Sequence, residues 1–488
     1  MEYLNKTSFL DGIHKLNPHF NMDEINKAYD FCLHAHKDQK RKSGEPYAIH
    51  PVSVALEVGK LNLDEASIIS ALLHDVIEDT KYTKKDIEKI FGKEVANIVE
   101  GVTKLEKIQF QEKQIRQVEN FRKLFLALSK DVRVLIVKLC DRVHNMRTIE
   151  FQKPEKQKLI ALETLEIYAP LAERVGLQQI KNELQDISFK ILNPDIYADI
   201  SKKIAKLEAD FNTSNTIEDI TREIANTMEN FNIPASIRGR KKMPYSIWRK
   251  MKKKNLNFEE VADIIAFRVI VGTEDDCYRA LGAIHRTYNS IPNKFKDFIS
   301  LPKSNGYRSL HTKIMGPKGR IVDIQIRTKA MHDEDEYGLA SHWKYKQGLS
   351  AEDKKKYLRA SWINRVLKIL QESKVNDVMN DTKIEIDERR VIAFTHSGEV
   401  IDLPYNATIL DFAFALNTQM GLFFDYAVIE GQTVGINYIV KNGDKIDIKL
   451  ASKPQVNTVW LNYTITGKAR NEIIAYLSED KNNKNSHH

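Results

Sequence analysis

The spacing of hydrophobic residues divides the chain into regions of different secondary structure. Through about residue 195, apolar residues recur every three or four positions, for example in 65–77, 86–102 and 118–146. This period predicts amphipathic helices. From about residue 217, short runs rich in Ile and Val alternate with helical segments, a pattern typical of a mixed α/β domain. The chain therefore should fold as an all-α region followed by an α/β region.

Further along, the same patterns predict individual elements. In the α/β region the expected strands are 264–271, 309–315 and 321–326, and the expected helices are 276–290 and 329–345. A Lys-rich, Gly-poor stretch predicts a helical connector over 351–388. A small half-barrel module should follow, because short strand patterns occur at 391–395, 400–403 and 446–450. The dipeptide Asn442-Gly443 favours positive φ and predicts a hairpin turn there. Another helix begins at 469–477.

Length and composition restrict the class of protein. With 488 residues the chain is too long for one hydrophobic core, and about three domains are expected. Hydrophobic residues make up 42% and charged residues 29%, which excludes disordered and collagen-like proteins. No apolar run approaches the ~20 residues that span a bilayer. The first residues lack the basic and apolar segments of a secretory signal, so we expect a folded, water-soluble protein.

Cysteine usage indicates the cellular compartment, and net charge indicates the class of partner. Cys32, Cys140 and Cys277 stand far apart, without the paired spacing of a zinc site or a disulfide framework. A reducing cytosol suits them best, and we expect a cytoplasmic protein. The net charge of +8 favours anionic partners. Charge alone leaves phosphates, nucleic acid and a membrane surface open.

A cluster of metal-capable side chains occurs within residues 74–79. In a helix, Glu78 would lie one turn from His74, and Asp79 one turn from Asp75. Burying such a cluster in an apolar helix would be costly without a partner for its charges. A solvated acidic face that includes one histidine explains this segment equally well.

Two further segments favour a metal site. Asp141 and Asn145 lie one turn apart after an apolar run, and His50 stands at an expected loop-to-helix junction. Together with His74 and Asp75, these residues offer imidazole and carboxylate ligands. Such a set, with vacant positions, suits a catalytic ion that carries water better than a closed structural site.

This H…HD…D pattern resembles the HD superfamily of metal-dependent phosphohydrolases. Its flanking segments, 41–51, 74–80 and 141–148, resemble the hydrolase domain of the long RelA/SpoT-family enzymes, which make and degrade the alarmone (p)ppGpp. The resemblance implies a manganese ion (Mn²⁺) held by His50, His74, Asp75 and Asp141. It implies that water is activated by Glu78 and Asp79, and that guanosine and its phosphates are held by Arg41, Lys42, Ser43, Asn145 and Thr148. Because the set is complete, a competent hydrolase is expected.

A strongly basic segment lies at 238–254, where nine Lys or Arg residues occur without an acid. By charge alone, a nucleic-acid surface or a solvated helix face is the commoner explanation. The segment also contains a turn and a hydroxyl, as a triphosphate pocket requires. Asp263 and Asp323 lie on expected strands and could share a Mg²⁺ that bridges the phosphates of ATP. Two exposed strand acids would explain them as well.

These segments resemble the RelA/SpoT synthetase domain, which has a nucleotidyltransferase-like α/β fold. The resemblance implies transfer of the β,γ-pyrophosphate of ATP to the 3′-OH of GDP or GTP, with Mg²⁺ bound by Asp263 and with Asp323 binding metal or accepting the proton. ATP would lie against Arg240, Lys242, Ser246 and Lys250. GDP or GTP would lie against Lys303, Asn305, Tyr307 and His311, with Tyr307 stacked on guanine. Residues 340–346 match the family's closing helix.

Three positions depart from the family pattern. Asp323 stands where the family usually has Glu, which keeps the charge but shortens the side chain by about one methylene. The loop 294–297 keeps the basic character of two-activity members, with Lys294 in place of Arg. Arg308 stands where Gln is common, and nothing in the sequence explains that exchange.

Segment 391–450 resembles a TGS domain, which implies a small β-grasp-like fold. In ribosome-activated relatives this module touches the end of uncharged tRNA through a histidine. Asn417 occupies that position. The TGS resemblance implies a ribosome or tRNA contact, but the exchange of histidine for asparagine argues against it. Residues 460–471 resemble the start of the family's helical domain. We expect either a naturally short regulatory half or a truncated chain.

The expected organisation has five parts. They are an HD-type hydrolase domain (1–195), a synthetase domain with leading connector helices (196–347), a helical linker (348–388), a TGS domain (389–452), and the start of a helical domain or a truncated tail (453–488). The main hypothesis is a bifunctional enzyme. Running both activities at once would waste ATP, so coupling through the helices at 150–215 is expected.

Two alternatives stay open. The chain could be an HD-family nucleotide phosphohydrolase whose second domain is not catalytic, with the Asp323 departure as its indication. It could also be an RNA- or ribosome-binding regulator that uses the basic segment 238–254 and the TGS fold. Incubation with ATP and GDP would separate the first alternative from the bifunctional enzyme. Binding without turnover would favour the second.

Overall fold

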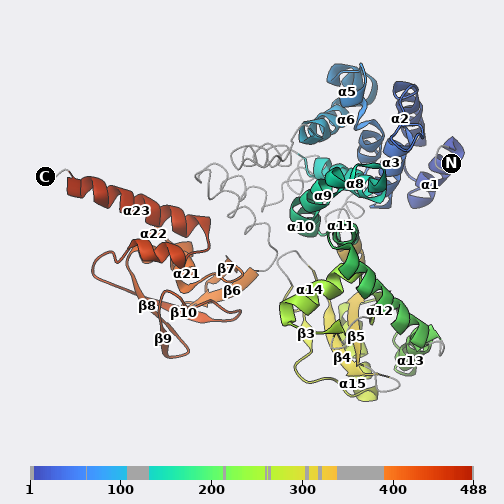
Figure 1. The fold of residues 1–488 in the computed structure, drawn as a ribbon. Coiled ribbons are helices and arrows are strands. Elements are labelled where there is room, and N and C mark those ends of the chain that lie inside the picture. Colours follow the sequence, from blue (N-terminus) through green and yellow to red (C-terminus); the bar gives the residue numbers. More distant parts are fainter. Residues whose placement is uncertain are drawn as a thin grey trace. The chain divides into compact units, whose positions relative to one another are not determined.

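The computed structural model describes residues 5–61, 63–106, 131–212, 216–258, 261, 265–302, 307–316, 321–337 and 390–485 (Figure 1). They fall into two compact units, each considered by itself. The first is drawn from Met1–Lys104 and Arg133–Lys354, and the second from Leu105–Val132 and Lys355–His488. Within the described ranges, no helix combines the length and apolar character that crossing a membrane requires.

The first unit begins with helices, as the hydrophobic period predicted. They are α1 (Lys6–Leu16), α2 (Met22–Ala35), α3 (Ile49–Lys60), α4 (Glu65–Leu73), α5 (Val76–Asp79), α6 (Lys84–Glu106), α8 (Arg133–Arg147), η2 (Ile149–Phe151), α9 (Pro154–Glu163), η3 (Thr164–Tyr168), α10 (Ala169–Arg174), α11 (Gln178–Leu192), α12 (Pro194–Asn212) and α13 (Thr216–Asn230). The expected helix 86–102 lies within α6 but is not continuous, because the backbone at Gly92 has a non-helical φ of 85° that kinks α6. Of the expected helix 118–146, residues 133–146 lie in α8, and 118–130 lie outside the described residues.

The expectation of one continuous helix over 65–77 was wrong. α4 ends at Leu73, residues 74–75 form a turn, and α5 starts at Val76. The apolar spacing continues across the turn and so does not reveal it. His74 Nδ1 lies 2.8 Å from the Ala71 carbonyl oxygen, one of the last carbonyls of α4, which a helix end leaves available. The turn therefore fixes the His74 ring against the end of α4.

A five-stranded sheet completes the first unit. Its strands are β1 (Ala235–Lys241), β2 (Ile265–Val271), β3 (Lys296–Asp297), β4 (Leu310–Met315) and β5 (Ile321–Thr328), in the order β1-β2-β5-β4-β3. β2 and β5 are parallel, and the other neighbours are antiparallel. The three expected strands are β2, β4 and β5. Sequence reasoning missed β1, whose Arg and Lys residues open the basic segment, and β3, which has only two residues.

Three helices accompany the strands. They are α14 (Pro244–Lys254), α15 (Glu274–Thr287) and α16 (Lys329–Tyr337). The expected helix 276–290 corresponds to α15. The expected helix 329–345 corresponds to α16 as far as Tyr337, and its remainder lies outside the described residues, as do the proposed closing helix 340–346 and the connector 351–388.

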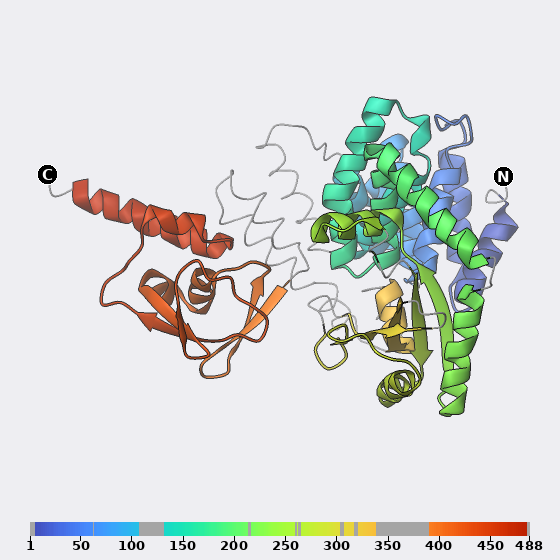
Figure 2. The same cartoon turned by 60° about the horizontal axis from the view of Figure 1, so that its bottom comes forward.

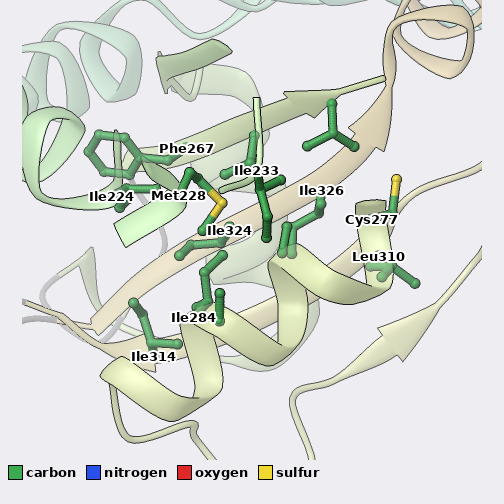
Figure 3. Packing of buried hydrophobic residues seen from close by; sticks show 14 of the residues in the cluster. Ile224, Met228, Ile233, Phe267, Cys277, Ile284, Leu310, Ile314, Ile324 and Ile326 are labelled. Carbon is green, nitrogen blue, oxygen red and sulfur yellow. The ribbon is translucent and has the colours of Figure 1, made fainter. Parts of the chain in front are cut away.

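One face of this sheet is apolar and the other is polar. Phe267, Leu310 and Ile324 belong to a buried cluster that includes residues of α13 and α15 (Figure 3). Because successive strand residues point to opposite faces, the other face carries Arg268 from β2, His311 and Lys313 from β4, and Asp323, Gln325 and Arg327 from β5. Lys313 stands directly opposite Asp323 in the β4–β5 register. The sheet thus separates its core from a face that can bind polar ligands.

The second unit is a mixed sheet with helices. Its elements are β6 (Arg390–Thr395), β7 (Val400–Pro404), α21 (Ile409–Leu416), α22 (Thr418–Leu422), β8 (Phe424–Ile429), β9 (Gln432–Val434), β10 (Lys445–Leu450), η7 (Thr458–Asn462) and α23 (Gly467–Asn485). The strand order is β7-β6-β10-β8-β9, with β6 and β10 parallel. α21 contacts β7, β8 and α23, and Figure 2 shows α23 (red) along one side of this unit. This β-rich arrangement confirms the expected fold class.

The hairpin expected at residues 442–443 was wrong. Gly443 has a positive φ of 91°, whereas Asn442 does not, so the type I′ turn of a tight hairpin, which needs two such residues, is not formed. β10 pairs with β6 and β8, while β9 pairs with β8. The turn therefore delivers the chain to the centre of the sheet instead of joining two adjacent strands.

Candidate functional site

Three of the predicted metal ligands meet in the helical part of the first unit. His50 comes from α3, His74 from the turn after α4, and Asp141 from α8. One ligand atom from each lies within 4.8 Å of the others, and all three residues are buried. His50 Nε2 is 3.1 Å and His74 Nε2 is 3.9 Å from Asp141 Oδ1. Residues far apart in the sequence thus converge on one point.

The fourth predicted ligand, Asp75, adjoins the same point. Its Oδ1 is 3.1 Å from His74 Nε2, and its Oδ2 is 3.6 Å from His50 Nε2. Asp75 is also buried. Burial alone would raise the pKa of Asp141, but the Lys138 ammonium, which lies 2.6 Å from its Oδ2, holds that pKa well below its usual range. The cluster therefore combines two imidazoles with two carboxylates.

The hydrogen-bond network assigns the His74 tautomer. A carbonyl oxygen can only accept, so His74 Nδ1, 2.8 Å from the Ala71 oxygen, carries the hydrogen. The neutral ring then presents the Nε2 lone pair to Asp75 and Asp141.

A second chain of contacts assigns His50 in the same way. Its Nδ1 lies 2.8 Å from His144 Nδ1, which also lies 3.2 Å from Arg41 Nη1. Guanidinium nitrogens only donate, so His144 Nδ1 is the acceptor and His50 Nδ1 must carry the hydrogen. Burial lowers the pKa of His50 to about 3 and that of His144 to about 4, and both rings are neutral at pH 7. The Nε2 lone pair of His50 therefore also points into the cluster.

Convergent lone pairs show that these residues fit a metal ion. Two imidazole Nε2 atoms and the carboxylate oxygens of Asp75 and Asp141 face one another at 3.1–3.9 Å. These atoms are all acceptors in the tautomers assigned above, and buried acceptors that face one another need a positive charge between them. Nitrogen and carboxylate donors suit a divalent first-row cation. The described residues therefore form a buried site with the chemistry of a metal centre.

Tyr47 joins the cluster to one of the predicted catalytic acids. Its hydroxyl oxygen is 2.7 Å from Asp75 Oδ2 and 2.8 Å from Asp79 Oδ2. A phenol has one hydrogen, so the two carboxylates share a single donor. Asp79 and Glu78 lie in the short helix α5 and are exposed. Asp79 thus reaches solvent while it is tied to the buried site.

The residues predicted to hold guanosine fall into two groups. Arg41 Nη2 lies 3.4 Å from Asn145 Oδ1 and 3.3 Å from Thr148 Oγ1, so these three side chains meet beside His144. Lys42 instead donates to Gln152 at 2.7 Å, and Ser43 donates to Glu45 at 3.1 Å. The structure brings Arg41, Asn145 and Thr148 together and leaves the other two at the loop surface.

A second group of predicted residues gathers near Asp323, which is buried on the polar face of the sheet. Ser246 and Lys250 lie one turn apart on α14. Burial, followed by the charges of Lys242, Lys313 and Lys254, lowers the pKa of Lys250 to about 8, and Asp323 opposes that shift. Burial also lowers the pKa of Lys313, again opposed by Asp323. The structure thus collects several ammonium groups around one buried acid.

Two of the residues predicted for the guanine nucleotide lie on the same side. The Tyr307 hydroxyl and His311 Nε2 are 2.7 Å apart, and His311 belongs to the polar face of β4. Burial raises the pKa of Tyr307 to about 12, so its hydroxyl stays protonated at neutral pH. Asp263, Lys303 and Asn305, together with the side chain of Arg240, lie outside what the structure describes.

Other charges on the polar face are occupied by α16. Arg268 Nη1 lies 2.6 Å from Glu336, and Arg327 Nη1 lies 2.5 Å from Asp335. Arg308, the departure noted above, pairs with Glu274 at 3.0 Å and with Glu334 at 3.4 Å. These arginines hold α16 and its surroundings against the sheet, which gives them a structural role.

Known protein families match successive parts of this chain. They are the HD domain over residues 28–178, the region found in RelA / SpoT proteins over 239–350, and the TGS domain over 391–450. A protein of Aquifex aeolicus named guanosine-3′,5′-bis(diphosphate) 3′-pyrophosphohydrolase is 40% identical over 487 residues, which cover 99% of this chain and 68% of that protein. The chain belongs to the RelA/SpoT family.

The relatives are longer than this RelA/SpoT-family chain, which spans about two thirds of their length. A GTP pyrophosphokinase rsh of Brucella melitensis is 41% identical over 476 residues, which cover 96% of this chain and 63% of that protein. Among solved structures, the small alarmone synthetase 1 from Bacillus subtilis bound to its product pppGpp is 23% identical, has a TM-score of 0.25, and covers 35% of this chain and 96% of that one. A TM-score this low supports no inference about the present chain.

Sequence reasoning missed four polar residues of these RelA/SpoT-type sites. His144 and Lys138 flank Asp141 at a spacing of three residues, and Tyr47 precedes His50 by three. In a helix that spacing places side chains on one face, a signal that could have identified His144 and Lys138. Lys313 has the alternating position expected of an exposed strand lysine, and only the pairing of β4 with β5 reveals that it faces Asp323.

In the TGS domain of this family member, Asn417 has a structural role. It lies between α21 and α22, and its side-chain oxygen accepts a hydrogen bond from the Met420 N–H at 2.7 Å. Asparagine is a favoured N-cap residue. The side chain thus stabilises the start of α22.

Proposed function

We propose that this chain is a bifunctional enzyme of alarmone metabolism, which hydrolyses the 3′-pyrophosphate of (p)ppGpp and also makes (p)ppGpp from ATP and GDP or GTP. The observation that carries the proposal is the convergence of two unprotonated imidazole nitrogens with the carboxylates of Asp75 and Asp141 in the HD region. The names of its relatives, a pyrophosphohydrolase and a pyrophosphokinase, supply the substrate class. The two activities use separate groups of residues.

In the hydrolase reaction, His50, His74, Asp75 and Asp141 would hold the metal, for which we propose Mn²⁺. The ion supplies Lewis acidity and lowers the pKa of its water. Asp79, oriented by Tyr47, and Glu78 stand at the solvent side and accept the proton of the attacking water. The water oxygen forms a bond to the phosphorus that carries the 3′ oxygen, the bond between that phosphorus and the 3′ oxygen breaks, and the 3′ oxygen takes up a proton as pyrophosphate and GDP or GTP are released. Guanosine and its phosphates are held by Arg41, Asn145, Thr148, Lys42 and Ser43.

In the synthetase reaction, ATP lies along Arg240, Lys242, Ser246 and Lys250. The 3′-OH oxygen of the acceptor attacks the β-phosphorus of ATP, the bond from that phosphorus to the α–β bridging oxygen breaks, and AMP leaves. Asp263 would hold Mg²⁺, which would offset phosphate charge, and Asp323 would either bind the same ion or take the proton of the 3′-OH. GDP or GTP binds against Lys303, Asn305, Tyr307 and His311.

The rest of the expected organisation is part of the same proposal. We propose the boundaries 1–195, 196–347, 348–388, 389–452 and 453–488 for the hydrolase, synthetase, linker, TGS and tail segments. We also propose a cytoplasmic location. A ribosome or tRNA contact through the TGS domain is not favoured, because Asn417 already caps α22.

Nucleotide chromatography of the purified chain tests the proposal. Labelled ATP with GDP and Mg²⁺ should yield ppGpp, and ppGpp with Mn²⁺ should yield GDP and pyrophosphate. Asp75→Ala should abolish degradation and leave synthesis, whereas Asp323→Ala should do the reverse. Degradation without synthesis would instead indicate a phosphohydrolase with a non-catalytic second domain. Loss of both activities from either change would contradict separate sites.

A further inference from the structure

Helix α14 begins without a side-chain cap of its own. Its N-cap residue, Met243, forms no side-chain capping hydrogen bond, and the first helical residue, Pro244, has no N–H. Ser246 and Ile247 donate their N–H groups to the Met243 carbonyl, at 3.0 and 3.2 Å. The remaining N–H group of the first turn belongs to Tyr245, and such groups need a partner when a helix end is packed inside a protein.

Asp186 supplies that partner from another helix. Its Oδ1 accepts the hydrogen bond from the Tyr245 N–H at 3.1 Å, and its Oδ2 accepts one from the Tyr197 hydroxyl at 3.0 Å. The side chain is only 8% exposed. Asp186 lies on α11, almost sixty residues before the helix that it caps. A carboxylate in this position also interacts favourably with the positive end of the α14 helix dipole.

Aromatic packing holds the same two helices together. The ring of Phe189, one turn after Asp186 on α11, lies 4.8 Å from Trp248 and 5.6 Å from Tyr245, measured between ring centroids. Trp248 also packs against a buried cluster that contains Ile247. One face of α11 therefore fixes both the start and the first turns of α14.

The residues that follow on α14 are those proposed to hold the phosphates of ATP. Ser246 comes directly after Tyr245, and Lys250 lies one turn further. A helix is rigid over such a distance, so the position of its first turn sets the positions of both side chains. A shift of about 1 Å in a substrate-holding group is enough to slow a reaction substantially.

We propose that Asp186 is a positioning residue for synthesis: by capping α14 from α11, it places Ser246 and Lys250 for the phosphates of ATP. This inference rests on the proposed synthetase function. Asp186 itself does not contact substrate, and it acts through the Tyr245 backbone. Helix α11, which lies before α12 and α13 in the sequence, thereby determines the geometry of the ATP side of the site.

The test compares Asp186→Ala, Asp186→Asn and the control Asp199→Ala in the full chain. Asp199 lies on α12 with a side chain that is 57% exposed. Asp186→Ala should speed hydrogen exchange of the Tyr245 amide about tenfold, the loss expected for one hydrogen bond to a charged group. It should also raise the KM for ATP about tenfold, with the KM for GDP and ppGpp hydrolysis unchanged. Asp186→Asn keeps an acceptor oxygen and should stay within about threefold of the parent in both readouts.

The outcomes separate this inference from the proposed function. If the parent chain makes no ppGpp, the proposed function fails, and affinity for the non-hydrolysable analogue AMPCPP replaces KM as the test of Asp186. Faster exchange of Tyr245 with unchanged ATP affinity would overturn the inference, because the cap would then be structural only. Equal effects of Asp186→Ala and Asp186→Asn would also overturn it. Should Asp186→Ala fail to fold, Asp186→Ser keeps a small polar side chain but removes the carboxylate that accepts from the Tyr245 N–H, and an unchanged KM for ATP in that variant would count against the inference.

Discussion

The Nδ1 atoms of His50 and His144 lie 2.8 Å apart, and Arg41 determines which of them carries the hydrogen. Because the guanidinium can only donate, His144 accepts from both neighbours, and His50 must donate through Nδ1. The opposite nitrogen of His50 is then available to a metal. This arrangement is typical of metal-binding histidines, whose second ring nitrogen is held by a neighbouring group.

We predict that His144→Phe weakens metal binding. Phenylalanine removes the acceptor for His50 Nδ1–H, so the ring can turn or change tautomer, and the affinity for Mn²⁺ should fall about 10- to 100-fold, as with other outer partners of metal ligands. His144→Asn places an oxygen near the position of Nδ1 and should restore most of the affinity. Calorimetry with Mn²⁺ measures the change, and ¹⁵N NMR reports the His50 tautomer. Equal affinities for the phenylalanine variant and the parent would refute the assignment.

A second prediction concerns Lys313, which faces Asp323 across β4 and β5. Lys250 lies within electrostatic range of Lys242, Lys313 and Asp323, and Lys313 also lies within range of Asp323. A partly buried group with this excess of positive charge suits a polyphosphate. Lys313→Met should therefore raise the KM for ATP about tenfold or more, the loss expected for a charge-assisted hydrogen bond.

Steady-state kinetics of Lys313→Met at saturating GDP measures this effect. The matched control is Lys329→Met, which removes the first residue of α16, a lysine whose side chain is 65% exposed. The control should behave as the parent. If Lys313→Met changed the KM for GDP and left the KM for ATP unaltered, Lys313 would act on the acceptor nucleotide, and the prediction would be wrong.

Lys250 should make synthesis sensitive to alkaline pH. Burial and neighbouring lysines lower its pKa to about 8, so the ammonium charge is present below that pH and is lost as the pH rises through it. The pH dependence of kcat/KM reports groups of the free enzyme. We predict that kcat/KM for ATP falls above pH 8, by up to about tenfold per pH unit.

Arginine replacement identifies the titrating group. A guanidinium stays charged throughout this range, so Lys250→Arg should move the alkaline fall to higher pH even if its overall rate is lower. Lys242→Arg leaves Lys250 in place and should keep a fall in the parent's range. The prediction is wrong if the pH profile of kcat/KM for ATP is the same for Lys250→Arg and the parent.

Local patterns in the sequence were sufficient for much of the fold and for candidate residues, but not for how they meet. The period of apolar residues predicted the helices, runs of Ile and Val predicted β2 and β5, and the alternation of buried and less buried positions fits β4. The turn at residues 74–75 was missed because apolar spacing continues through it. The basic composition of 238–241 obscured β1, an edge strand. In the first case the His74 ring bonds to the end of α4, and in the second the pairing of β1 with β2 makes a strand of a basic segment. Neither interaction can be seen in the local sequence pattern.

Long-range contacts explain which site residues were missed. His50, His74 and Asp141 could be grouped by their ligand chemistry and by a resemblance to known enzymes, but no spacing rule predicts that α3, the turn after α4 and α8 bring them together. Asp186 has no local signal at all, since its role depends on the packing of α11 against α14. Lys313 acquires significance only from the strand register. Sequence patterns therefore predict residue types better than their partners.

The last prediction concerns the stability of the second unit, where Asp411 joins two segments. Thr408 and Asp411 form a capping box at the start of α21. Asp411 also accepts hydrogen bonds from the backbone N–H groups of Ile465, at 3.0 Å, and Thr466, at 2.8 Å, just before α23. The carboxylate is fully buried, so its removal leaves the partly buried N–H groups of Ile465 and Thr466 without this acceptor.

We therefore expect Asp411→Ala to lower the free energy of unfolding of this unit by about 3 kcal/mol, from the lost cap and the unpaired, partly buried donors. Urea unfolding of the full chain, followed through the buried Trp460 and by hydrogen exchange of α21, measures the change. Asp411→Asn keeps one acceptor oxygen and should lose less. The exposed Asp425 on β8 provides the control Asp425→Asn. If the urea midpoint of Asp411→Ala matched that of this control, the hydrogen bonds of Asp411 would contribute little to stability.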